Sequence, residues 1–467
     1  MFHLLPGARK IGAVEVRFRG IVESVDAFEV PGSEPQVRNV VFEHPHFSPH
    51  GPGQVYCSDE ANRPFATDAN KFAFFSTVAA TWIDQLDDAP DVVHLHDWHA
   101  AFYCLLREYG KDFDRLRKIP TVFTIHNLSY QGVRPFSGDE SSLQAWFPDL
   151  PLEQSVVRDP RYSDCLNPMA AAIRLADKIS TVSPTYASEI CKPNNDDLGF
   201  IGGEGLEADL ARANAADRLV GILNGCSYDH PIGRRPGWQR ILKLIDEQVA
   251  AWANREPDNR AHSLARQRLQ TLPKRRPKQL LTSIGRLVRQ KASLLFEELP
   301  TGLSALDAIL NDLGSNGVII ILGSGETMYE QRMLEVAERH NNLLFLCGYS
   351  ETLAEPLYRA GDLFLMPSSF EPCGISQMLA MRATQPCIVH GVGGLNDTVM
   401  NNRSGFVFTG KTTQQQAQNF VATVSRALAI RAGKNDQWQK ICIRAASARF
   451  SWAESAKQTI EKLYEEA

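Results

Sequence analysis

The stretch from Asp362 to Thr398 constrains the fold more than any other part of the chain. It begins with a short apolar run, Asp362–Pro367, of the length typical of a buried strand. A loop and a segment of helical character follow, and a second apolar run, Cys387–His390, leads into a glycine loop. This order predicts two neighbouring parallel strands. Because open α/β sheets bind ligands at the carboxyl ends of their strands, we expect a ligand crevice here.

The two loops of this stretch carry groups that suit a sugar beside a phosphate. Glu371, in the sequence FEPCG, can accept hydrogen bonds from sugar hydroxyls. Gly393 and Gly394 lie between a strand and a helix, where backbone N–H groups can hold a phosphate. Each signal alone is weak, since most loop glutamates are simply solvated and most Gly-Gly pairs form tight turns.

Apolar runs of strand length recur along the chain, and each ends in a polar or glycine cluster. Alternation of these runs with helical segments predicts an α/β fold with a doubly wound parallel sheet in each half. Short strands or hairpins are expected within residues 1–60. The predicted parts are an N-terminal domain at 1–230, a polar linker at 231–278 with a helical piece near Gln239–Trp252, a C-terminal domain at 279–448 and a final helix at 449–467.

The composition disfavours several kinds of binding partner and favours one cellular compartment. The 467 residues are enough for two or three domains, and the net charge of −5 disfavours binding to nucleic acid or to an anionic membrane. Because no run of 18 apolar residues occurs, no membrane span is expected. The nine cysteines are scattered without a CxxC pair, which favours reduced thiols and a cytoplasmic protein over disulfides or a zinc site.

Two cations follow the first predicted strand of the second half. Arg286 and Lys291 lie five residues apart in GRLVRQK, where they can neutralise a diphosphate leaving group. Surface charge is the commoner explanation for such a pair. Cys373 has no activating base in the sequence, so we expect a small residue in a tight loop rather than a nucleophile. The HDWH cluster that begins at His96 lacks a matching third ligand set, which disfavours a metal site.

With these motifs in view, the chain resembles bacterial glycogen synthases and plant starch synthases, which are retaining glycosyltransferases of the GT-B fold. The resemblance implies transfer of glucose from ADP-glucose to the non-reducing end of an α-1,4-glucan, with no metal and no cofactor. SWAESAKQTIEKLY resembles the family's last helix, which returns to the first domain. The matching stretches are VVHLHDWHAAF, TVFTIHNLSYQG, DKISTVSPTYASEI, GILNG, SIGRLVRQK, ILGSGE, DLFLMPSSFEPCGISQMLAMR and GGLNDTV.

The resemblance also implies roles for single residues. Arg286 and Lys291 would stabilise the departing diphosphate, and His126 would lie beside the donor glucose. Glu371 would contact the glucose hydroxyls. Substrate contacts are implied for Asp97, Asn127, Asn224, Cys373, Gly374, Gly393 and Gly394.

One departure from the family leaves alternatives open. The family's first strand with its Gly-Gly loop has no match here, and the first such pair is Gly202-Gly203, so we expect an N-terminal domain that lacks its first βα unit. The alternatives are a catalytically impaired glucan-binding fragment or scaffold, and another GT-B glucosyltransferase that uses UDP-glucose. A phosphorylase is disfavoured because no lysine for pyridoxal phosphate lies within 371–397. Met378 stands where sucrose-type enzymes carry a second glutamate, which favours the glycogen and starch branch.

Overall fold

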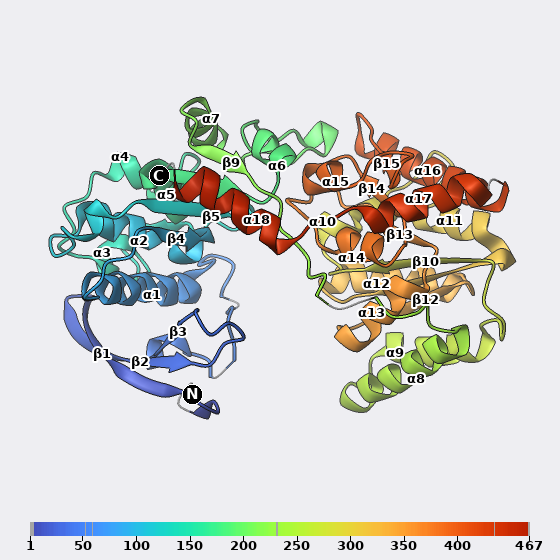
Figure 1. The fold of residues 1–467 in the computed structure, drawn as a ribbon, viewed down its shortest axis with the longest axis horizontal. Coiled ribbons are helices and arrows are strands. Elements are labelled where there is room, and N and C mark those ends of the chain that lie inside the picture. Colours follow the sequence, from blue (N-terminus) through green and yellow to red (C-terminus); the bar gives the residue numbers. More distant parts are fainter. Residues whose placement is uncertain (1–3, 52, 58, 230–231, 434, 466–467) are drawn as a thin grey trace.

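The protein consists of two α/β halves. The computed structural model describes residues 4–465 apart from 52, 58, 230, 231 and 434. Figure 1 shows the halves side by side, the first coloured blue to green and the second mostly yellow to red. Each half contains a parallel sheet, which confirms the predicted fold class.

The N-terminal half opens with an antiparallel sheet in the order β1 (Arg9–Phe18), β2 (Ile21–Val30) and β3 (Asn39–Glu43). Val14, Val16 and Phe18 are buried in the same core as residues of the helix α1 (Ala66–Asp84). They alternate along β1 because successive side chains of a strand point to opposite faces. The three strands confirm the strands or hairpins expected within residues 1–60.

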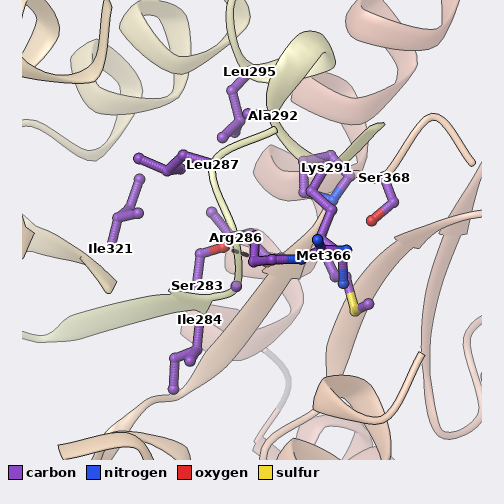
Figure 2. Close-up of a pocket in the computed structure, with 13 residues that line it drawn as sticks. Ser283, Ile284, Arg286, Leu287, Lys291, Ala292, Leu295, Ile321, Met366 and Ser368 are labelled. Atoms are coloured by element: carbon purple, nitrogen blue, oxygen red, sulfur yellow. Dashed lines mark hydrogen bonds between the residues drawn. The ribbon is translucent and has the colours of Figure 1, made fainter. Parts of the chain in front are cut away.

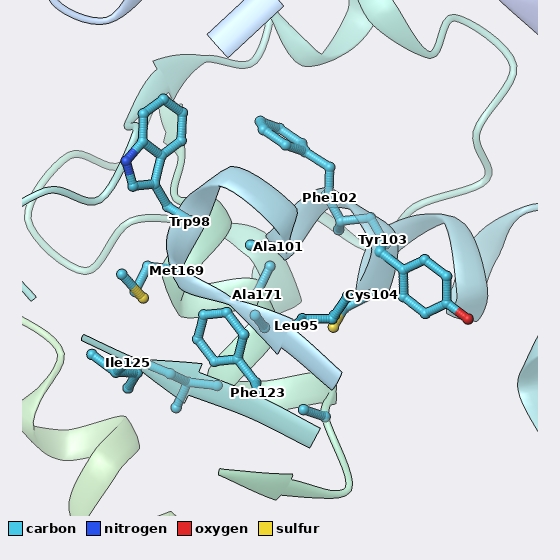
Figure 3. Packing of buried hydrophobic residues seen from close by; sticks show 14 of the residues in the cluster. Leu95, Trp98, Ala101, Phe102, Tyr103, Cys104, Phe123, Ile125, Met169 and Ala171 are labelled. Carbon is cyan, nitrogen blue, oxygen red and sulfur yellow. The ribbon is translucent and has the colours of Figure 1, made fainter. Parts of the chain in front are cut away.

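A four-stranded parallel sheet forms the centre of this half. Its order is β4 (Val93–His96), β5 (Thr121–Ile125), β8 (Lys178–Thr181) and β9 (Leu219–Gly221). Figure 3 shows Leu95 and Phe123 of the sheet beneath Trp98, Phe102 and Met169 of two covering helices. Within the described residues β4 pairs with β5 alone, and the expected lack of a first βα unit stays a prediction. The other elements are α2 (Asp97–Tyr109), β6 (Arg134–Pro135), α3 (Leu143–Trp146), α4 (Gln154–Val157), β7 (Cys165–Leu166), α5 (Pro168–Leu175), α6 (Pro184–Glu189) and α7 (Glu207–Ala215).

The second half is built on a six-stranded parallel sheet. Its order is β12 (Leu343–Leu346), β11 (Gly317–Leu322), β10 (Gln279–Ile284), β13 (Leu363–Met366), β14 (Cys387–His390) and β15 (Gly405–Phe408). β13 and β14 are adjacent and parallel, as the stretch around Glu371 predicts. All residues of β11 are buried, as expected for a strand covered on both faces. The helices are α10 (Arg289–Ala292), α11 (Ala305–Leu313), α12 (Thr327–Arg339), α13 (Glu351–Ala360), α14 (Ser376–Arg382), α15 (Gly393–Thr398) and α16 (Thr413–Gly433).

The range 231–278, predicted from its composition to be a linker, contains two packed helices. They are α8 (Trp238–Arg255) and α9 (Arg260–Thr271). Ile241, Ile245 and Val249 recur at every fourth position of α8 and pack in one cluster with residues of β10, β11 and β12. The helical piece expected near Gln239–Trp252 is confirmed by α8, but the polar composition of the range does not reveal that it packs on the sheet. Because of this packing, most of the range belongs structurally to the second half. Arg276, in the basic run Lys274–Lys278 of the predicted linker, pairs with Asp362 at 2.8 Å.

The end of the chain returns to the first half. After α17 (Asn435–Ser447), α18 (Trp452–Thr459) lies along the N-terminal half in Figure 1, coloured red, and continues as a π-helical turn, Ile460–Tyr464. The Tyr464 hydroxyl lies 2.8 Å from Nδ1 of His94 on β4. No helix among the described residues is long and apolar enough to cross a membrane. All nine cysteines are free thiols.

Candidate functional site

The predicted pair of cations lies directly after β10. Arg286 is exposed, and Lys291 belongs to the short helix α10. Both side chains line a small cavity of ≈ 20 Å³ that Met366 and Ser368 close from the end of β13. Figure 2 shows the two side chains directed toward this end of the neighbouring strand. Two positive charges are therefore held at the carboxyl ends of adjacent strands.

Lys291 is paired with the predicted glutamate. Its Nζ lies 3.2 Å from Oε2 of Glu371, and the Ser368 hydroxyl donates to the same oxygen at 3.1 Å. Glu371 is buried, with 5% of its surface exposed. A buried carboxylate requires such partners, because an unpaired charge in a low-dielectric site is costly. Lys291 and Glu371 thus form one ion pair, a contact that the separate sequence motifs do not specify.

On the facing half, Asp97 follows β4 and forms hydrogen bonds to the loop that follows β5. Its Oδ1 accepts the backbone N–H of His126 at 2.7 Å and that of Asn127 at 3.4 Å. Asp97 has a left-handed φ of 56°, a conformation that non-glycine residues adopt only where the surroundings enforce it. The carboxylate therefore fixes the loop that carries the His126 ring. The Asn127 side chain accepts from the Ser129 N–H at 3.0 Å within the same loop.

The His126 ring contacts a second histidine that the sequence argument left without a role. Nε2 of His126 lies 3.0 Å from Nδ1 of His96. Burial lowers the pKa of both rings. At neutral pH both imidazoles are therefore uncharged, and each can donate from one nitrogen and accept at the other.

Cys373 lies where the two halves meet. The backbone N–H of Asn224 donates to its sulfur, and burial raises the pKa of the thiol to about 12. Such a thiol stays protonated at neutral pH, which agrees with the expected structural role rather than a nucleophilic one. Gly374 follows with a φ of 75°, a left-handed conformation that favours glycine.

Gly393 and Gly394 bring their loop directly against the loop of Glu371. A Cβ on Gly393 would lie 2.0 Å from the Glu371 carbonyl oxygen, and one on Gly394 would lie 2.3 Å from that of Cys373. The Gly394 N–H donates to the Glu371 and Pro372 carbonyls, and the Gly393 N–H donates to Glu189. Both N–H groups are thus engaged within the protein, and the need for glycine is explained by close approach. Phosphate binding by these N–H groups stays a prediction. It requires that the phosphate displace the backbone carbonyls and Glu189 as their acceptors.

Helix α6 of the first half docks on this loop, a contact that the sequence argument missed. The Ser183 hydroxyl donates to the Pro372 carbonyl at 2.6 Å. The Thr185 N–H and hydroxyl both donate to the Asp397 carboxylate, at 2.8 and 2.6 Å. Glu189 also contributes to this contact, because its carboxylate accepts the Gly393 N–H. The motif SPTY after β8 is the one sequence signal that marks this segment.

Glu189 is a buried acid whose pKa is raised. Both carboxylate oxygens lie 3.1 Å from the Gly393 nitrogen, and 9% of the residue is exposed. Burial, together with the nearby Asp397 carboxylate, raises the pKa of Glu189 from 4.5 to about 7. The contact between the halves therefore contains a carboxyl group that titrates near neutral pH.

This titration predicts a loss of stability as the pH rises. Because the pKa is raised in the folded state, the stabilising contribution of Glu189 is complete below pH 4.5 and is lost as the pH rises through about 7. Between these two limits the contribution of Glu189 to the free energy of unfolding falls by about 3 kcal/mol. The variant Glu189→Gln keeps an acceptor for Gly393 without the charge, and we expect it to unfold at a higher temperature than the parent protein at pH 8 but not at pH 5.

Thermal unfolding at several pH values measures this difference. The matched control is Glu335→Gln on the exposed face of α12, which should follow the parent protein at every pH. An unchanged pH dependence in the Glu189 variant would contradict the prediction.

The structure thus gathers the predicted residues into linked groups. Lys291 pairs with Glu371, and Arg286 lines the same cavity as Lys291. Asp97 holds the loop of His126 on the facing half. The contacts from Asn224 to Cys373 and from Ser183 to Pro372 connect the halves beside the Glu371 loop.

Comparison with known proteins places this arrangement in a family. Residues 4–212 match the family described as the starch synthase catalytic domain, and residues 278–429 match glycosyl transferases group 1. A glycogen synthase of Desulfitobacterium hafniense is 32% identical over 85% of this chain and 77% of its own length. That of Lactococcus lactis is 31% identical over 97% of this chain and 86% of its own.

Solved structures agree with this assignment. The catalytic domain of starch synthase IV from Arabidopsis thaliana, bound to ADP and acarbose, superposes with a TM-score of 0.75 at 27% identity, covering 98% of this chain and 88% of that one. A sucrose-phosphate synthase of Thermosynechococcus elongatus, 17% identical with a TM-score of 0.50, shares the fold over 94% of this chain and 88% of that one. The two facing sheets are those of a GT-B glycosyltransferase, and the chain belongs to the glycogen synthase and starch synthase family.

Proposed function

We propose that the protein transfers glucose from ADP-glucose to the non-reducing end of an α-1,4-glucan with retention of configuration. The observation that carries this proposal is the pair of half-buried Lys291 and buried Glu371 beside Arg286, at the strand ends of the second sheet. It offers cations for a diphosphate next to a carboxylate for sugar hydroxyls. The choice of ADP-glucose is supported by the ADP bound to the related plant starch synthase.

Each charged group has a separate task in this proposal. Arg286 and Lys291 neutralise the negative charge that develops on the leaving diphosphate. Glu371 accepts hydrogen bonds from the donor glucose and also keeps Lys291 in place. His126, held by Asp97, lies on the donor side of the facing half, and Asn127, Asn224, Cys373 and Gly374 line the substrate crevice between the two.

The proposed transfer occurs on one face of the sugar. The bond between glucose C1 and the diphosphate oxygen breaks, while a bond forms between C1 and the acceptor O4 on the same face. The acceptor proton passes to an oxygen of the leaving diphosphate, so ADP and the extended glucan are the products. The leaving diphosphate must stay beside the acceptor hydroxyl in order to receive this proton. Arg286 and Lys291 are the residues that hold the negative charge of the diphosphate there.

Incorporation of radiolabelled glucose into glycogen tests the proposal. The purified chain is supplied with ADP-glucose or UDP-glucose in parallel, and we expect faster incorporation from ADP-glucose. A preference for UDP-glucose would overturn the assignment of the donor. Binding to glycogen without incorporation from either donor would favour a glucan-binding protein instead.

A further inference from the structure

A cluster of arginines lies at the edge of the second sheet opposite the catalytic loops. Asp362 immediately precedes β13 and is 6% exposed. Its carboxylate lies 2.7 Å from Arg235, 2.8 Å from Arg276 and 3.0 Å from Arg431, and also accepts the Leu280 N–H. The catalytic loops follow the carboxyl ends of β10, β13 and β14, so this cluster belongs to a different edge.

The cluster carries more positive charge than its acids balance. A fourth guanidinium, that of Arg359 on α13, lies beside Arg235 and has Glu355 at 3.4 Å as its partner. Four arginines thus face two carboxylates, a surplus of two positive charges. The pKa of the Arg276 guanidinium is lowered by burial, although Asp362 opposes this, and further by the repulsion of Arg235 and Arg431. One carboxylate shared by three arginines leaves this repulsion incompletely compensated.

Two of the four arginines, Arg235 and Arg359, line a cavity of ≈ 420 Å³. This volume lies within the range of sites that hold small molecules. Arg235 and Arg359 contribute positive charge to its lining, and Trp438 on α17 also lines it. Among the described residues that line the cavity, Asp362 is the one acid, and its oxygens already have four donors.

The cavity also touches the segment that connects the two halves. Ile232 and Gly233 line it, and Nη1 of Arg359 donates to the Arg234 carbonyl at 2.9 Å. Arg235 donates to the Ala360 carbonyl from Nε at 3.1 Å, while 48% of its side chain remains exposed. The connecting segment is therefore held in place by the same arginines whose charge is in surplus.

We propose that this cavity is a binding site for a phosphate group, free or carried by a small sugar, with Arg235 and Arg359 as its ligands. Guanidinium groups suit phosphate oxygens because their planar N–H pairs match the oxygen spacing. The site is separate from the catalytic crevice and does not rest on the proposed transferase function.

Titration calorimetry at constant ionic strength tests the site. The Arg286→Ala, Lys291→Ala double variant serves as the parent protein, because it removes the catalytic cations that would also bind phosphate. Inorganic phosphate and a hexose monophosphate are the probes, with glucose as the uncharged comparison. We expect both probes to bind one site in this parent protein. A hexose monophosphate that binds tenfold more tightly identifies a sugar phosphate as the ligand, and equal affinities identify free phosphate.

Substitution of the arginines then locates the site. Arg235→Gln combined with Arg359→Gln is expected to weaken phosphate binding at least tenfold, while Arg276 and Arg431 still neutralise Asp362. The matched control is Arg260→Gln, which removes an exposed arginine paired with Glu338 at 2.6 Å and should change affinity less than twofold.

A cavity-filling variant covers the case in which the arginine variants fold poorly. Ala383→Phe projects into the cavity from its lining and leaves every arginine in place, so it should also weaken binding at least tenfold. Undiminished binding in this variant, or no phosphate binding in the parent protein, would overturn the proposal.

Discussion

Replacing Arg286 with alanine is expected to lower turnover at least a hundredfold. The guanidinium stands beside Lys291 at the end of β10, where the proposed diphosphate gains charge as the glycosidic bond breaks. Removing one such contact from a transition state costs about 2.7–4 kcal/mol, which corresponds to a factor of about 10²–10³ in rate. Because this contact strengthens as the bond breaks, we expect kcat to fall more than KM rises.

Steady-state kinetics with ADP-glucose and glycogen measure this effect. The control is Arg289→Ala, which removes the exposed arginine at the first residue of α10, three residues further along the chain, and should leave kcat within about twofold. Arg286→Lys keeps the charge without the planar N–H pair and is expected to retain part of the activity. Turnover of Arg286→Ala near that of the parent protein would remove Arg286 from the catalytic role.

The positions of the strands, and hence the edge that carries the site, could be predicted from sequence. Apolar runs of four to six residues, each followed by a polar cluster, correspond to β4, β5, β8, β10, β13 and β14. The proximity of Lys291 to Glu371 and of Asp97 to His126 follows from this order, because parallel strands bring their carboxyl ends to one edge.

What the sequence does not show are contacts between elements far apart in the chain. Glu189 meets Gly393 across the two halves, and Arg235, Arg276 and Arg431 converge on Asp362 from three separate segments. No local period or motif encodes such pairings. The sequence pattern indicates a helix near residues 239–252, which corresponds to α8, but its polar average composition does not show that this helix packs on the second sheet.

The need for a glycine at position 393 could be anticipated, but its physical reason comes from the structure. We expect Gly393→Ala to lower activity at least a hundredfold and to destabilise the protein. The new Cβ would meet the Glu371 carbonyl oxygen at 2.0 Å, and the φ of 42° is unfavourable for alanine. Overpacking of this kind costs about 1–3 kcal/mol. A shift of the Glu371 backbone changes its contact with Lys291, and a displacement of about 1 Å at a reacting centre reduces rates about a hundredfold.

Activity and thermal unfolding measured on the same preparation separate the two effects of this substitution. Below the unfolding transition the protein remains folded, so a loss of kcat there reports the displaced Glu371 rather than a smaller folded fraction. The control is Gly237→Ala at the start of α8, where φ is −65° and no atom lies within 4 Å of an added Cβ. We expect this control to match the parent protein in both measurements. An active Gly393→Ala variant would show that the loop of Glu371 moves aside without cost, and the close contact between the two loops would then not be what positions the Lys291–Glu371 pair.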